Sequence, residues 1–136
     1  RKVHITLATF YLGCNLSGQS LKDNITESDL REASRSLKNV QQTICEKIPE
    51  SRYSTVQGKL LQSVYDYRSS QVTPDQKVDF LRNAFEYAKE AECAARDYHF
   101  MEMVEWSQTC KALCTEELVR EKLMELNLQF TIHPKV

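Results

Sequence analysis

The most chemically versatile side chains in this sequence belong to five cysteines: Cys14, Cys45, Cys93, Cys110 and Cys114. Cys110 and Cys114 stand four residues apart, so on a helix they would share one face. Together with Cys93 or His99 they could in principle bind a tetrahedral zinc ion. Structural zinc sites, however, combine two close Cys pairs, or a Cys pair with a His pair, and this chain has only one such Cys pair. We therefore expect ordinary helical cysteines and no metal site.

Catalysis by these thiols would require a nearby general base, and catalysis by the carboxylates would require a metal-binding motif. The candidate bases are His4, His99 and His133, and none of them lies in a local signature that would recruit a thiol. No Glu is followed three residues later by His, which excludes the usual di-metal carboxylate bundle. The sequence also lacks phosphate-binding loops, dinucleotide fingerprints and nucleophile elbows. The prediction is a protein with no catalytic residues and no cofactor.

Composition places the chain among ordinary globular domains. It has 136 residues, of which 41% are hydrophobic and 27% charged, and this length suits one domain. The formal net charge of -1 predicts no attraction to nucleic acid. No stretch approaches the run of about 18 apolar residues that a membrane span needs. Only three Gly and three Pro are present, which argues against turn-rich β folds.

The cysteine count also bears on the compartment. An odd number of cysteines without a regular spacing favours free thiols, and hence a cytoplasmic or nuclear location. The alternative is a secreted helical bundle that acts as a ligand or effector, stabilised by disulfides. It is motivated by the same cysteines and by two glycosylation sequons, which begin at Asn15 and Asn24. The chain begins at Arg1 rather than Met, so we expect a segment of a larger protein or a processed product.

The three prolines lie between segments of helical periodicity and not within them. This placement is what helices require, because proline disrupts the interior of a helix. Thr26 is a predicted N-cap for a helix from residue 27, and Thr73 is another, with Gln76 completing a capping box. Thr115 is a third candidate N-cap, and a break at Cys114–Thr115 would raise the helix count from five to six. The predicted helices cover residues 2–14, 27–48, 52–71, 75–96, 100–113 and 116–126.

The apolar pattern is informative in one predicted helix and in the tail that follows the last one. In helix 75–96 the apolar residues span roughly 200° of the helical wheel, so we predict that this helix is central and the most buried. On that basis Phe85→Ala should cost about 3–5 kcal/mol. In the tail, Leu128, Phe130 and Ile132 alternate with polar residues, which predicts an extended segment over 127–136 after a helical domain over 1–126.

The sequence therefore predicts an all-α fold of five to six helices in consecutive antiparallel hairpins, over residues 2–48, 52–96 and 98–126. Each hairpin pairs an aromatic-containing first helix with a second helix. In this layout the chain resembles tetratricopeptide-like repeats, although the Trp-Leu-Gly-Tyr and Ala-Phe-Pro signatures of that family fall in register on no hairpin. The resemblance implies stacked helical hairpins, and both an open repeat and a closed bundle satisfy it.

Aromatic and acidic residues gather in the later helices, where residues 86–105 contain six acidic and two basic side chains. Most of the aromatic residues should fill the core, but a few could line a groove with an acidic rim, which would suit a basic or amphipathic segment. We hypothesise a non-enzymatic interaction module, a scaffold or adaptor domain, that binds a partner helix or basic segment of another protein. The predicted partner-binding residues are Glu86, Tyr87, Glu90, Tyr98, Glu102, Glu105 and Trp106.

Overall fold

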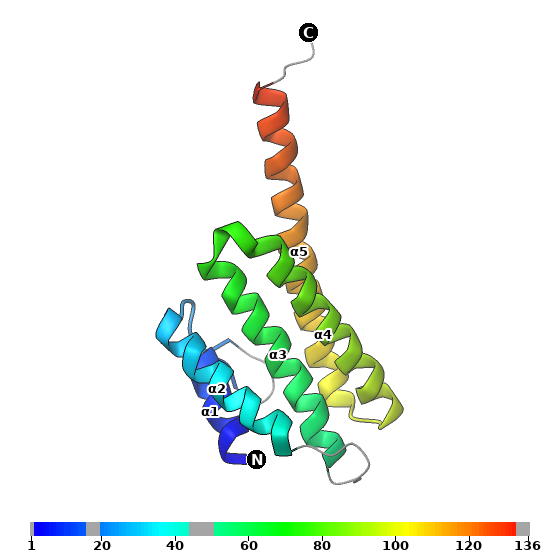
Figure 1. Ribbon diagram of the computed structural model, residues 1–136. Coiled ribbons are helices and arrows are strands. Elements are labelled where there is room, and N and C mark those ends of the chain that lie inside the picture. Colours follow the sequence, from blue (N-terminus) through cyan, green and yellow to red (C-terminus); the bar gives the residue numbers. More distant parts are fainter. Residues whose placement is uncertain (1, 16–19, 44–50, 133–136) are drawn as a thin grey trace.

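The computed structural model describes residues 2–15, 20–43 and 51–132, and this part of the chain is almost entirely helical (Figure 1). The elements are α1 (Lys2–Leu12), α2 (Glu27–Thr43), α3 (Arg52–Val72), the 3₁₀ turn η2 (Pro74–Gln76), α4 (Lys77–Asp97) and α5 (Met101–Ile132). Within the described residues, extended pairing is limited to one isolated bridge between Cys14 and Ser20. The all-α prediction is confirmed.

The end of α1 and the start of α2 lie where their cap residues predict. The chain leaves α1 through Gly13, whose φ of +68° is the left-handed conformation that glycine adopts without strain. At the start of α2, the Asp29 N–H donates to the Thr26 hydroxyl and the Thr26 N–H donates to the Asp29 carboxylate, both at 3.1 Å. This reciprocal cap holds the pKa of Asp29 below its ordinary value. Residues 44–48, also predicted to be helical, lie outside the described residues.

The central helix of the fold is α3, which contacts α1, α2, α4 and α5. Val56, Leu60 and Leu61 on this helix are completely buried. In Figure 1, α1 and α2 lie on one side of α3, and α4 and α5 on the other. The prediction that helix 75–96 is the most buried is therefore wrong, although α4 does pack on two sides, against α3 and α5. Its buried residues are one leucine and four alanines: Leu81, Ala84, Ala88, Ala91 and Ala95.

The predicted capping box at the start of α4 does not form. The Thr73 side chain makes no capping hydrogen bond. Instead the Gln76 N–H donates to the Thr73 carbonyl at 3.2 Å, and residues Pro74–Gln76 make a 3₁₀ turn. The α-helix begins at Lys77, two residues later than predicted.

The largest departure from the sequence prediction is the length of α5. The expected break at Cys114–Thr115 is absent: α5 is continuous through these residues, and the Thr115 hydroxyl donates to the Lys111 carbonyl at 2.8 Å instead of capping a new helix. The third predicted hairpin therefore does not exist. Residues 127–132 are helical rather than extended, while residues 133–136 lie outside the described part. As a result α5 runs past the ends of α3 and α4 and projects from the bundle (Figure 1).

Candidate functional site

Three of the predicted partner-binding residues lie together on α4, in a groove that this helix forms with α3. Glu86, Tyr87 and Glu90 line a groove of about 350 Å³ with Gln62 and Asp66 of α3, among other residues. Glu86 and Glu90 are exposed and Tyr87 is half-buried. Across the same pair of helices, the Lys59 ammonium lies 3.1 Å from the Glu90 carboxylate. The groove is therefore acidic, with one of its carboxylates already in an ion pair.

The other four predicted residues do not line this groove. Trp106 is only 4% exposed and belongs to the core, so the structure does not present it as an anchor for a partner. Tyr98 is half-buried, and the Arg52 guanidinium lies 5.0 Å from the centre of its ring. Glu102 and Glu105 are exposed on the first turns of α5. The seven residues thus do not form a single surface.

The most unusual group in the acidic groove is the carboxyl of Asp66, which is only 6% exposed. Burial raises its pKa from the ordinary 3.8 to about 6, and a hydrogen bond with Gln62 partly opposes this. A proton is therefore bound more tightly in the folded protein than in the unfolded chain. Below about pH 4 this group is protonated in both states and carries no penalty. As the pH rises from about 4 to about 6, the unfolded chain releases this proton while the folded protein still binds it, so the free energy of unfolding falls; above about pH 6 it levels off.

We predict that Asp66→Asn raises the free energy of unfolding near pH 7 by about 2 kcal/mol. It should also remove most of the decrease in stability between about pH 4 and pH 6, as measured by urea denaturation at a series of pH values. Glu86→Gln is the matched control, since Glu86 lines the same groove but is exposed. Equal stability of Asp66→Asn and the wild type at pH 7 would contradict the proposed cost of this buried charge.

Three of the cysteines, Cys14, Cys110 and Cys114, line a cavity of about 200 Å³ between α3, α5 and the segment after α1. Burial raises the pKa of Cys14 and Cys114 to about 11 and that of Cys110 to about 12. These thiols are therefore protonated at neutral pH, and a protonated thiol is a poor nucleophile and metal ligand. Among the described residues, no group of three or more His, Cys, Asp or Glu side chains is placed to hold a metal ion.

The guanidinium of Arg68, at the edge of the same cavity, has a structural role. Arg68 is 5% exposed and donates hydrogen bonds to the backbone carbonyls of Leu12, Lys22 and Asp23. It also donates to the Ser20 hydroxyl and the Gln71 side chain. These contacts fasten the connection between α1 and α2 to the central helix, and they leave the guanidinium without an unused N–H.

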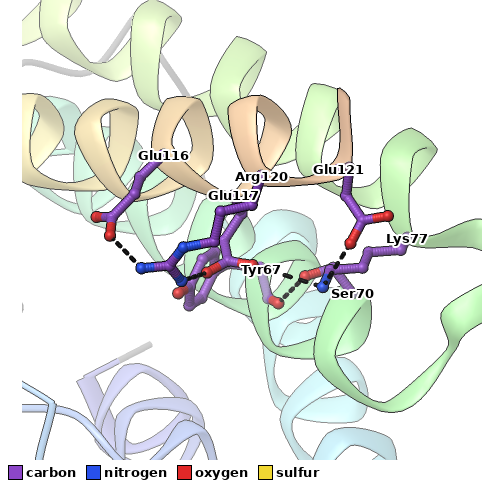
Figure 2. Close-up of polar contacts among 7 residues, drawn as sticks. All are labelled: Tyr67, Ser70, Lys77, Glu116, Glu117, Arg120 and Glu121. Atoms are coloured by element: carbon purple, nitrogen blue, oxygen red, sulfur yellow. Dashed lines mark hydrogen bonds and ion pairs between the residues drawn. The ribbon is translucent and has the colours of Figure 1, made fainter. Parts of the chain in front are cut away.

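Where α5 leaves the bundle, it is held by a cluster of charged side chains (Figure 2). The Lys77 ammonium, at the start of α4, lies 3.5 Å from the Glu117 carboxylate and 3.0 Å from that of Glu121. The hydrogen bond with Glu121 is the main reason why the pKa of Lys77 is raised. On the same face of α5, Arg120 pairs with Glu116 and Glu117. The two Lys77 pairs join α5 to the start of α4, and Tyr67 and Ser70 of α3 lie beside the cluster.

Beyond the cluster, a groove of about 670 Å³ runs between the start of α4 and the projecting part of α5. Its apolar lining comes from Val78 of α4 and from Leu118, Met124 and Leu128 of α5. Met124 and Leu128 are 63% and 59% exposed. Two basic and two acidic side chains complete the lining, namely Arg82, Lys122, Glu121 and Glu125. We call this feature the α4–α5 groove.

This groove was not predicted, because the alternation of Leu128, Phe130 and Ile132 indicated an extended tail from residue 127 and not a longer helix. Every described residue from 122 to 129 is exposed. A long α5 also leaves apolar side chains on its opposite face, where Val119 and Leu123 are 53% and 55% exposed. The available signal was helical spacing: Val119, Leu123 and Leu126 follow a 4-3 pattern, and the sequence has Phe130 four residues later.

No protein-family model matches the chain, and no curated protein or solved structure matches it significantly. Within the described residues, none of the helices combines the length and the apolar character that crossing a membrane requires.

Proposed function

We propose that the chain is a non-enzymatic interaction module, a scaffold or adaptor domain that binds an amphipathic helix of a partner protein in the α4–α5 groove. The observation that carries this proposal is the exposure of Met124 and Leu128 beside Val78, on a helix that projects from the bundle. Large exposed apolar side chains that gather in one groove are typical of protein-binding surfaces. An amphipathic helix buries its apolar stripe in such a groove.

The lining charges suggest the chemistry of the partner. Arg82 and Lys122 stand against Glu121 and Glu125, so the groove has no net charge. A partner helix with acidic and basic residues beside its apolar stripe would match it. Such charges mainly affect the rate of association and the choice of partner, while the apolar contacts supply most of the affinity.

The buried thiols support a binding role over an enzymatic one, because burial keeps all three protonated. They also bear on the compartment that we propose, the cytoplasm or nucleus. Cys14, Cys93, Cys110 and Cys114 are all free thiols. Cys110 and Cys114 lie on one continuous helix, which does not bring side chains four residues apart into disulfide geometry without distortion.

The proposal is tested by affinity capture with the full chain, followed by measurement of the dissociation constant for the purified partner. We expect Met124→Glu and Leu128→Glu each to raise this constant by about tenfold or more, because a charge would enter the apolar lining. The matched control is the double variant Glu102→Lys/Glu105→Lys, which changes exposed residues on the first turns of α5. It should bind as the wild type does. Unchanged binding by both groove variants would overturn the proposal.

A second binding surface is the acidic groove lined by Glu86, Tyr87 and Glu90, which fits the basic segment that the sequence predicts as a partner. Its specific support is the buried Asp66 carboxyl in the same groove, because a bound cation would favour the ionised form. Glu86→Lys belongs in the same binding experiment. If Glu86→Lys abolishes binding and Met124→Glu does not, the partner occupies the acidic groove.

A further inference from the structure

A second apolar surface of α5 faces away from the α4–α5 groove. It consists of Val119, Leu123 and Leu126, which are 53%, 55% and 36% exposed and do not line that groove. At 100° per residue these three positions fall within an arc of about 60°. The spacing of four and then three residues is that of the contact positions in a two-stranded coiled coil, and it continues in the sequence at position 130. We call this surface the outer seam.

We infer that a second copy of this chain covers the outer seam, with the two α5 helices antiparallel about a two-fold axis between Leu123 and Leu126. In this register Leu123 of each copy packs against Leu126 of the other, and Val119 lies opposite position 130 of the second copy. The surface is then self-complementary, as a two-fold interface must be. The interface goes beyond the proposed partner groove, which lies on the other face of the helix.

The charges around the outer seam favour the antiparallel arrangement. One heptad before Leu123, the seam position is occupied by Glu116. In a parallel pair the two Glu116 carboxylates would face each other, which is unfavourable. In the antiparallel pair, the flanking Arg120 lies opposite Asn127 of the second copy, and Lys122 lies opposite Gln129. No like charges meet in this register.

The length of the projecting segment matches the same register. Position 132 of the second copy would lie beside residue 117, where the Lys77 cluster holds α5 against the bundle. The overlap therefore covers the projecting part of each helix and stops where the bundle begins (Figure 1). An isolated helix of about 15 residues is only marginally stable in water, so a second helix would stabilise the one that projects.

The first experiment is sedimentation equilibrium of the full chain from about 1 µM to about 1 mM. We expect a reversible monomer–dimer equilibrium. Leu123→Glu should raise the dimer dissociation constant by about tenfold or more, because it places two charges in the central layers. Met124→Glu is the matched control, one residue away on the groove side, and it should leave the dimer unchanged. A wild type that stays monomeric at about 1 mM, or a dimer that Leu123→Glu leaves intact, would overturn the inference.

The second experiment tests the orientation by disulfide cross-linking in a Cys45→Ser/Cys93→Ser background. A mixture of Lys122→Cys and Gln129→Cys chains should form the mixed disulfide about tenfold faster than either chain forms one with itself. Circular dichroism of each variant at low concentration checks that the bundle remains folded. In a parallel dimer Lys122 would instead lie beside Asn127 of the second copy. Faster cross-linking of Lys122→Cys with Asn127→Cys than with Gln129→Cys would therefore overturn the antiparallel register. Loss of dimerisation in Leu123→Glu with partner binding intact would separate this interface from the proposed groove.

Discussion

Leu60→Ala is expected to lower the free energy of unfolding by about 2–5 kcal/mol, which could unfold a domain of ordinary stability. Leu60 is completely buried on α3, and α3 contacts four other helices. Truncation would therefore leave a cavity at the centre of the fold that the surrounding helices cannot easily close. Urea denaturation followed by circular dichroism measures the change, provided that the dependence on denaturant stays the same.

Phe85→Ala is the comparison that separates the observed architecture from the one predicted by periodicity. Phe85 lies half-buried on α4, with the Lys111 ammonium 6.0 Å from the centre of its ring. Because part of the ring already contacts water, its truncation should cost about 1–2 kcal/mol, less than that of Leu60. A larger loss for Phe85→Ala than for Leu60→Ala would mean that α4, and not α3, is the central helix.

Local patterns in the sequence were sufficient for the first two helices. In the second predicted helix the apolar residues Leu30, Ala33, Leu37 and Val40 follow a helical 3-4-3 spacing, and all four are buried. These four residues belong to the common hydrophobic core, and α2 contacts α1 and α3. Thr26, a short polar side chain before an acidic first turn, likewise indicated the start of α2.

The identity of the central helix did not follow from apolar residues alone, because part of the buried surface of α3 is polar. Ser63 and Arg68 are buried there, and both owe their burial to hydrogen bonds with other segments. The Ser63 hydroxyl donates to the Ala84 carbonyl of α4 at 2.6 Å. A helical wheel that counts only apolar side chains treats such positions as solvent-facing. It therefore underestimates the burial of a helix whose buried polar side chains are hydrogen-bonded.

The candidate site shows a similar limit. The acidic groove could be predicted in part, since Glu86, Tyr87 and Glu90 are close in the sequence and fall on one side of a helix. Trp106 could not be placed, because the apolar residues in the first half of α5 are scattered around the wheel. The α4–α5 groove also depends on a tertiary fact, namely how far α5 continues beyond its last contact with the bundle.

Arg68→Met is expected to lower the free energy of unfolding by about 2–3 kcal/mol. Methionine keeps much of the apolar stem but removes the donors that hold the carbonyls of Leu12, Lys22 and Asp23. Replacing a buried charge with an apolar side chain can be neutral when its polar partners are removed as well, but here the carbonyls remain. Leu12 is completely buried, so its carbonyl is the least able to replace the lost hydrogen bond from Arg68 with one from water.

The loss should be concentrated at one end of the molecule, because Arg68 joins the connection between α1 and α2 to α3. Hydrogen exchange is expected to accelerate in α1 by about tenfold or more, while α4 and α5 change only through the lower global stability. Arg31→Met is the matched control, since Arg31 is exposed on α2 and its replacement should change stability by less than about 0.5 kcal/mol. Equal stability of the Arg68→Met and Arg31→Met variants would mean that the hydrogen bonds of the buried guanidinium only balance the free-energy cost of its desolvation. The first helix would then be held against α3 by apolar contacts alone.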